Sequence, residues 1–178
     1  ILDKSALARK LEHRADSLDE LPGSTDRGLL EGQIVLVGYG RVGRRLGQAL
    51  RARGMAVVII DQNRTIIEAL REDGIPAVLG DGSSPEALMQ AHIAHASMLV
   101  LAVDDPVVTQ RTACLAREIK PNLAIVIRAH SQDEADHYHE VGLGIALVPE
   151  TALAEQMATK VFENYSTRPG QSAVRLGP

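Results

Sequence analysis

Aromatic residues and cysteine are scarce in this sequence of 178 residues. There is no tryptophan and only one phenylalanine, so the stacking platforms of single-strand nucleic-acid binders are missing. The net charge of -4 also argues against a non-specific nucleic-acid binder. The lone cysteine, Cys114, cannot form a disulfide framework, which favours a reducing compartment. Its position between Ala113 and Leu115 in a predicted helix indicates a core residue.

Long apolar runs are absent as well. No run approaches the roughly 20 residues that span a bilayer, and there is no signal-peptide pattern. Because the chain opens with Ile1 rather than methionine, we expect a fragment of a longer protein. Hydrophobic residues still make up 45% of the chain, enough for the core of one α/β domain with short extensions.

Six short β-branched and apolar runs alternate with amphipathic stretches, which is typical of β–α–β units. The predicted strands are residues 34–37, 57–60, 77–79, 98–103, 124–127 and 145–148. Helix starts are indicated by Ser84-Pro85, by Asp105-Pro106 and by a capping box at residues 131–134. The sequence therefore predicts an α/β fold with a doubly wound parallel six-stranded sheet, the Rossmann fold.

Three regions follow from this pattern. Residues 1–32 are polar and are expected to form a linker, with a helical segment near residues 5–19. Residues 33–165 are expected to form the nucleotide-binding domain, and residues 166–178 a flexible tail. The last predicted helix, residues 151–165, carries two apolar stripes. We expect one stripe to pack on the chain's own sheet and the other on a second copy, giving a homodimer.

A glycine-rich motif, Gly38-Tyr39-Gly40-Arg41-Val42-Gly43, directly follows the first predicted strand and opens a helix. In this position the motif predicts a nucleotide site. Gly38 would permit the tight turn, Gly40 the approach of backbone to a phosphate, and Gly43 the close packing of helix on sheet. Arg41 could add a charge-assisted contact to the anion bound at the helix N-terminus. The alternative is a structural glycine turn.

Acidic residues follow the next strands at the same sheet edge. Asp61 lies 23 residues after Gly38, where an acid bonds the ribose hydroxyls, and its charge disfavours a 2′-phosphate, although the nearby Arg64 weakens that exclusion. Asp61 could instead cap the next helix. Asp81 could meet adenine or ribose, Asp105 is expected to cap a helix, and Asp104 could do either. Arg128 is expected to pair with a phosphate or with one of these acids.

Catalytic signatures are missing. No tyrosine has a lysine four residues later, and there is no Walker A lysine and no Gly-x-Ser-x-Gly elbow. His137 and His139 should diverge on their helix, and His92 and His95 are expected to be surface or helix-end residues. Little sequence remains after the sixth strand to build a substrate domain. We therefore expect a protein that is not an enzyme. The alternative is a small NAD-dependent oxidoreductase or a cofactor-binding subunit of one.

The glycine loop, Asp61, the Gly80-Asp81 turn and the stretch AHIAHASMLVLAVDD resemble RCK domains, the regulators of K⁺ conductance, also called KTN or TrkA-N domains. The likeness covers about residues 34–162 and is greatest to the C-terminal domains of Kef-type monovalent cation:proton antiporters. It implies ligand contacts for Gly38, Gly40, Arg41, Val42, Asp61, Gln62, Asp81 and Arg128. The complete expected site is Gly38, Tyr39, Gly40, Arg41, Val42, Gly43, Asp61, Gln62, Asp81, Gly82, Val103, Asp104 and Arg128.

The resemblance also implies a function. We expect a nucleotide-sensing domain that gates a K⁺ or Na⁺/H⁺ antiporter at the cytoplasmic face of the inner membrane. AMP, another adenine nucleotide or NAD(H) would be the ligand. The partners would be a second copy of the chain and a transmembrane antiporter domain, normally in the same polypeptide. A free-standing subunit that assembles on a separate transporter is the alternative. No glutathione site can be matched residue by residue.

Overall fold

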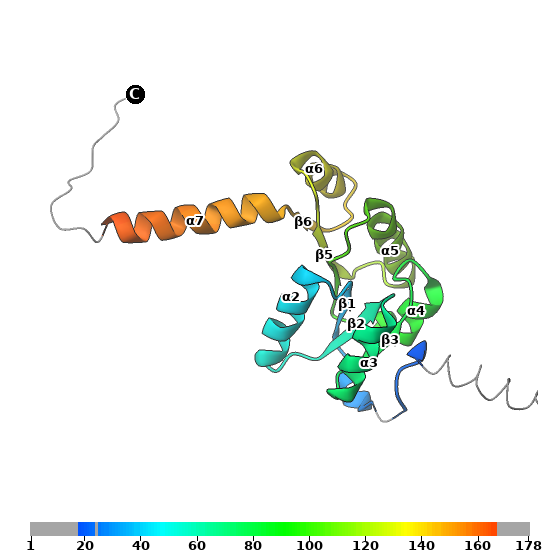
Figure 1. The fold of residues 1–178 in the computed structure, drawn as a ribbon. Coiled ribbons are helices and arrows are strands. Elements are labelled where there is room, and N and C mark those ends of the chain that lie inside the picture. Colours follow the sequence, from blue (N-terminus) through cyan, green and yellow to red (C-terminus); the bar gives the residue numbers. More distant parts are fainter. Residues whose placement is uncertain (1–17, 24, 167–178) are drawn as a thin grey trace, which may run out of the picture.

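In the computed structural model, which describes residues 18–23 and 25–166, six parallel strands form one sheet in the order β3-β2-β1-β4-β5-β6. This order confirms the predicted Rossmann fold (Figure 1). The strands are β1 (Ile34–Val37), β2 (Val57–Asp61), β3 (Ala77–Leu79), β4 (Met98–Leu101), β5 (Ala124–Arg128) and β6 (Ile145–Leu147).

Two strands are shorter than predicted, because each ends where its pairing with the neighbouring strand stops. The run at residues 98–103 was expected to be one strand, but β4 ends at Leu101. Ala102 still donates its N–H to Val37 across the sheet, so the chain stays next to β1 for one more residue. Apolar character continues to Val103 because this segment remains packed on the core. The sixth strand likewise ends at Leu147, one residue earlier than predicted.

The helices between the strands begin and end at the expected residues, give or take one or two. They are α2 (Arg41–Ala52), α3 (Arg64–Glu72), α4 (Pro85–Gln90), α5 (Pro106–Ile119) and α6 (Gln132–Glu140), with short 3-10 turns η2 (Arg27–Leu30) and η3 (Ile93–His95). Ser84, Asp105 and Ser131 accept hydrogen bonds from helix N–H groups, which confirms three predicted caps. In the third, the Glu134 carboxylate bonds the N–H of His130, one residue before the cap.

Alternate residues of each strand pack on opposite layers of helices. Val35 and Val37 belong to a core with side chains of α4, α5 and α6, whereas Leu36 belongs to a second core with side chains of α2 and α3. The central strands β1, β2 and β4 are buried on both faces, as their continuous apolar runs indicate. Both cores position the carboxyl ends of β1, β2 and β4 side by side.

Cys114 was expected in the core, and that prediction is wrong because the residue is exposed. The buried face of α5 is formed by Thr109, Thr112, Ala113 and Ala116. Cys114 is the residue after Ala113 and is therefore rotated about 100° around the helix axis from it, because one turn takes 3.6 residues. Its side chain therefore points to solvent.

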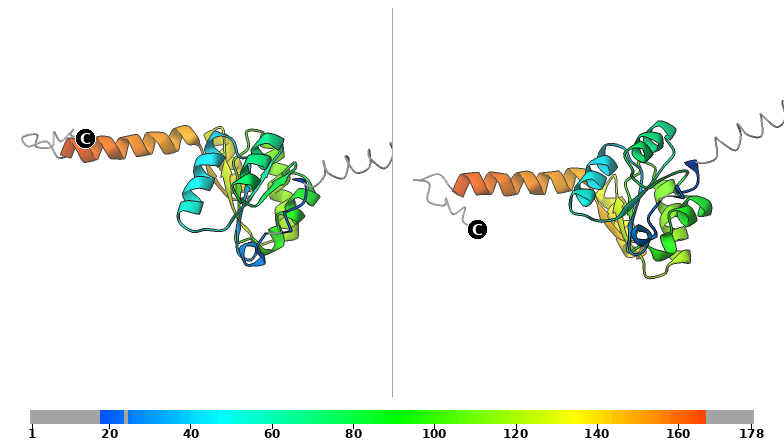
Figure 2. Two further views of the ribbon diagram at one scale, coloured as in Figure 1. Left: turned by 60° about the horizontal axis from the view of Figure 1, so that its bottom comes forward. Right: turned by 90° about the horizontal axis from the view of Figure 1, so that it is seen from below.

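The final helix, α7 (Pro149–Ser166), extends away from the sheet (Figures 1 and 2). The expectation that one apolar stripe packs on the chain's own sheet is wrong, since both stripes are exposed, with Phe162 68% exposed. α7 includes Ser166, the first residue of the predicted tail. The rest of that tail, and nearly all of the helical segment expected near residues 5–19, lie outside the described residues. Within the described ranges, no helix is both long and apolar enough to cross a membrane.

Candidate functional site

The glycine loop connects β1 directly to α2 at the carboxyl edge of the sheet. Gly38 has a φ of +89°, and a Cβ there would lie 2.9 Å from Val103 Cγ1, so both backbone angle and space require glycine. A Cβ on Gly43 would collide with the carbonyl oxygen of Gly38, which explains how α2 approaches the sheet so closely. A Cβ on Gly40 meets nothing within 4 Å. The loop therefore leaves open space in front of the N-terminus of α2.

Asp61 joins the end of β2 to this loop. Its Oδ2 accepts a hydrogen bond from the N–H of Tyr39 over 2.6 Å, and its Oδ1 accepts one from the N–H of Asn63 over 2.8 Å. Asn63, not Asp61, is the N-cap of α3, since its side chain accepts from the N–H of Ile66. The alternative assignment of Asp61 as the helix cap is therefore wrong. Asp61 instead fixes the glycine loop to the neighbouring strand.

A cavity of about 520 Å³ lies beside the loop, between the ends of β1, β2 and β4. β1 separates β2 from β4 in the sheet, and the strand order reverses at this point. Ligands of open α/β sheets bind in the crevice at such a reversal. Six of the predicted site residues line this cleft: Gly38, Asp61, Gln62, Gly82, Val103 and Asp104.

A second cavity of about 500 Å³ adjoins the cleft and shares Gln62 and Gly80 with it. Asp81 lines this second cavity, and its Oδ1 also accepts a hydrogen bond from the N–H of Ser83. The Gly80-Asp81-Gly82 turn therefore lies between two adjacent hollows at the ends of β2 and β3. A Cβ on Gly82 would collide with the side chain of Val37, so the turn also packs tightly against β1.

Arg128 at the end of β5 forms an ion pair with Asp104, which lines the cleft. Of the two roles left open for Arg128, pairing with an acid is thus present in the structure. The Nε of Arg128 is buried without a hydrogen-bond partner among the described residues. Asp105 accepts from the N–H groups of Val107 and Val108 and is confirmed as a helix cap.

The remaining predicted site residues lie around the loop but outside the lining of the cleft. Tyr39 is 5% exposed and its ring packs under α2, where a Cβ on Gly47 would touch it. Arg41 and Val42 are exposed on the first turn of α2. Their roles as ligand contacts, like those of the whole predicted set, stay predictions.

Three further residues that line the cleft carry no functional signal in the sequence. Val37 and Ile60 are the last apolar residues of β1 and β2, and Val108 lies in the first turn of α5. They share one feature that the sequence does show, since each lies within a few residues of the carboxyl end of a predicted strand. Their apolar or small side chains gave no chemical reason to select them.

None of the described histidines lines this cleft. Within the ranges that the structure describes, no three His, Cys, Asp or Glu side chains are placed to hold a metal ion. His137 and His139 are both exposed on either side of the buried Tyr138, so they diverge as predicted. His92 and His95 lie at the opposite end of the sheet, just before β4.

Comparison with known proteins identifies relatives of this arrangement. The TrkA-N domain family matches residues 34–149. The putative cation/proton antiporter YbaL of Escherichia coli (strain K12) is 36% identical over 123 residues, which are 69% of this chain and 22% of YbaL. The glutathione-regulated potassium-efflux system protein KefC of Enterobacter sp. (strain 638) is 34% identical over 127 residues, 71% of this chain and 18% of KefC. The chain thus spans about a fifth of the length of these relatives.

Solved structures agree with the sequence comparison. The crystal structure of the TrkA-N domain of YbaL from Escherichia coli superposes with a TM-score of 0.68 at 34% identity, covering 72% of this chain and 95% of that domain. The Kef C-terminal domain of Shewanella denitrificans in its AMP-bound form has a TM-score of 0.65 at 26% identity, covering 79% of this chain and 83% of the other.

Proposed function

The chain belongs to the TrkA-N domain family, and from this premise we propose that it is a nucleotide-sensing regulatory domain of a cation/proton antiporter. The observation that carries the proposal is the cleft at the β1–β4 reversal, where the glycine loop and Asp61 meet. The AMP-bound Kef domain, at 26% identity, supports an adenine nucleotide as the ligand.

The phosphate would lie in front of the N-terminus of α2. The open space at Gly40 admits an anion close to the backbone, and the first N–H groups of α2, at Arg41, Val42 and Gly43, have no partner earlier in the helix. The side chain of Arg41 is exposed beside this point and could bind a phosphate oxygen. Arg128 could contribute through its charge at the other side of the cleft.

The ribose and base would extend toward β2 and β3. Each oxygen of Asp61 accepts one hydrogen bond in the structure and keeps a lone pair for a ribose hydroxyl. The negative charge of Asp61 disfavours a 2′-phosphate, so AMP, ATP or NAD(H) fits better than NADP(H). Gln62, Asp81 and Gly82 line the connected hollows where adenine would lie, and Val103 forms the wall beside β4.

We propose that the domain regulates transport and does not turn over the nucleotide. A ligand that binds two dimer conformations unequally shifts their populations, and residues 1–32 would pass the change to a membrane domain upstream in the same polypeptide. Coupling of about 1–3 kcal/mol gives a 5- to 150-fold effect on transport. The exposed apolar stripes of α7 would form the homodimer. The domain would face the cytoplasm.

The test uses the full-length antiporter in proteoliposomes. Cation-coupled proton flux is measured with and without AMP in the compartment that the regulatory domain faces. We expect AMP to change the proton flux through the wild type but not the flux through the Asp61→Ala variant. An Asp73→Ala variant, altered at the exposed end of α3, should respond as the wild type does. Identical AMP responses of the wild type and Asp61→Ala would exclude this site as the sensor. Steady NADH consumption with carbonyl substrates would instead favour an oxidoreductase.

A further inference from the structure

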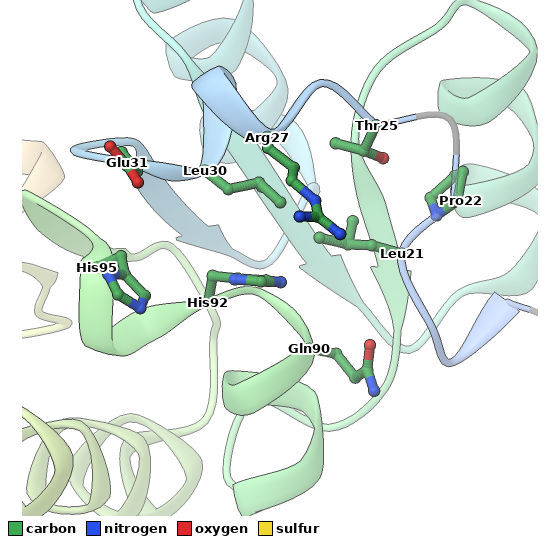
Figure 3. Close-up of a pocket in the computed structure, with 10 residues that line it drawn as sticks. Leu21, Pro22, Thr25, Arg27, Leu30, Glu31, Gln90, His92 and His95 are labelled. Carbon is green, nitrogen blue, oxygen red and sulfur yellow. The ribbon is translucent and has the colours of Figure 1, made fainter.

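A cavity of about 470 Å³ lies at the end of the sheet opposite the nucleotide cleft (Figure 3). It lies between residues 21–23 and 25–31, which precede β1, and the turn of His92 and His95, which precedes β4. The nucleotide proposal makes no use of it. Figure 3 shows Arg27 extending across the hollow toward His92, with the amide of Gln90 below.

His92 has an unusual backbone for its residue type. It is the residue after the C-cap of α4, and its φ is +55°. Three other helices of this chain, α2, α3 and α6, have a residue with positive φ at the same position. In each of them it is a glycine: Gly54 at +75°, Gly74 at +70° and Gly142 at +65°. Side chains make this conformation less favourable, so glycine is the usual choice. His92 is the one non-glycine residue with positive φ among the described residues, which makes its side chain worth examining.

The backbone around His92 is held rigidly. The side chain of Gln33 is fully buried, and its Nε2 donates to the carbonyls of Ala91 and His92, both over 3.0 Å. The N–H of Gly32 donates to the carbonyl of His95 over 2.9 Å. These bonds tie the His92 turn to the residues that enter β1. The two imidazole rings have their centroids 6.4 Å apart.

The chemistry of the cavity favours an anion. Its charged and titratable side chains are Arg27, Glu31, His92 and His95. In Figure 3, Leu30 lies between Glu31 and Arg27, and these two side chains form no ion pair. Among the described residues, no hydrogen bond or ion pair engages the side chain of Arg27 or of either histidine. Guanidinium and imidazolium groups bind phosphate and carboxylate oxygens with charge-assisted hydrogen bonds.

We propose that this cavity is a second ligand site, which takes a small oxyanion with phosphate or carboxylate oxygens. Arg27 and His92 are its two principal contacts, and the amide of Gln90 adds a neutral donor. The site borders the segment that leads into β1 from the N-terminal side, while the nucleotide cleft lies at the far end of the same strand. It is independent of the proposed nucleotide site, because the two share no residue.

The test is calorimetric titration of the 178-residue chain with inorganic phosphate and, separately, with citrate. We expect saturable binding of one or both anions. Arg27→Gln should weaken it at least about tenfold, the effect of losing one charge-assisted hydrogen bond. Arg53→Gln, which alters an exposed arginine outside the cavity, should not. Binding of phosphate alone or citrate alone would identify the class of anion.

His92→Gly separates binding from folding. Glycine suits the positive φ, so the melting temperature of this variant should equal or exceed that of the wild type, while its anion affinity falls. Absence of binding by both anions at tens of millimolar would overturn the proposal. Affinities that are unchanged in both Arg27→Gln and His92→Gly would also overturn it, because they would place the bound anion elsewhere, such as at the glycine loop.

Discussion

Three glycines of one loop have different structural tasks. Gly38 is required by its positive φ, Gly43 by the contact of α2 with the Gly38 carbonyl, and Gly40 by neither. The fold itself thus gives no steric reason for glycine at position 40, where an L residue could adopt the observed φ of -72°. A ligand that approaches the backbone does give one.

This difference predicts opposite effects for two matched substitutions. Gly43→Ala should destabilise the domain by about 1–3 kcal/mol, because its Cβ forces the backbone apart. Gly40→Ala should cost about 0.5–1 kcal/mol, at the low end of the range for placing alanine at an N-cap. It should nevertheless weaken AMP binding at least tenfold by occupying the phosphate position. Urea unfolding and calorimetry measure the two effects. If the Gly40→Ala variant bound AMP with the affinity of the wild type, the phosphate would not lie at this position.

Asp61 should contribute to nucleotide affinity through the ribose. Replacing it with alanine removes a charged acceptor, which is worth about 1.5–3 kcal/mol, or roughly 10- to 150-fold in Kd. Because Asp61 also accepts from the Tyr39 N–H, the glycine loop could shift in this variant. Asp61→Asn keeps one acceptor oxygen and should show an intermediate loss of AMP affinity. Wild-type affinity in both variants would refute the ribose assignment.

At the scale of single elements, α7 stands out because the rest of the described structure leaves its apolar side chains uncovered. Its large apolar side chains Leu153, Met157, Val161 and Phe162 are all exposed. Exposed apolar patches of this extent are uncommon on monomers and typically mark interfaces. A helix in this state is explained if a second copy covers it.

The dimer proposal predicts that Met157→Glu combined with Phe162→Glu yields a monomer in sedimentation velocity, since two charges would be desolvated at the interface. Gln156→Glu adds a charge on the other side of α7 and is the control, which should remain dimeric. A wild-type chain that sediments as a monomer at tens of micromolar would contradict the proposal.

Helix α6 carries a tyrosine whose titration depends on folding. Tyr138 is buried, and its hydroxyl donates to Glu134 Oε1 over 2.6 Å. Burial, followed by the hydrogen bond and the charge of Glu134, raises the pKa of the Tyr138 hydroxyl. The unfolded chain therefore loses this proton first, near the ordinary pKa of about 10.

The sign of the resulting pH dependence follows from linkage. The contribution of Tyr138 is complete below about pH 10 and declines as the pH rises above it. We expect the free energy of unfolding to fall more steeply between about pH 10 and 11 in the wild type than in Tyr138→Phe. Equal slopes for the two proteins in denaturant titrations would show that Tyr138 titrates alike in both states.

Local patterns in the sequence were sufficient to predict the elements but not their contacts. The side chains of Ser84, Asp105 and Ser131 cap N–H groups two or three positions away, so the sequence predicts these caps directly. The pairing of Asp104 with Arg128 joins two strands and depends on the sheet order. The exposure of Cys114 depends on the rotation of α5, and the exposure of α7 on whether a partner is present.

At the scale of the whole molecule, the sheet presents two hollows at its opposite ends. The strand order places the glycine loop, Asp61 and Val103 around the cleft at the carboxyl edge. The segment that leads into β1 lies at the other edge, where Arg71 also binds the carbonyls of Leu18 and Glu20. Burial lowers the pKa of the Arg71 guanidinium and the nearby Asp19 opposes that shift, consistent with an arginine held between the two segments. In the proposed arrangement, the nucleotide would bind at the carboxyl end of β1, and residues 25–33 lead into its other end.

The central claim is that the cleft binds an adenine nucleotide, and calorimetric titration of this chain with AMP, ATP, NAD⁺ and NADH tests it most directly. We predict saturable binding of at least one of the four, with one site per chain, and a weaker interaction with NADP⁺ than with NAD⁺ because Asp61 repels the 2′-phosphate. No heat of binding from any of the four at millimolar concentration would contradict the account.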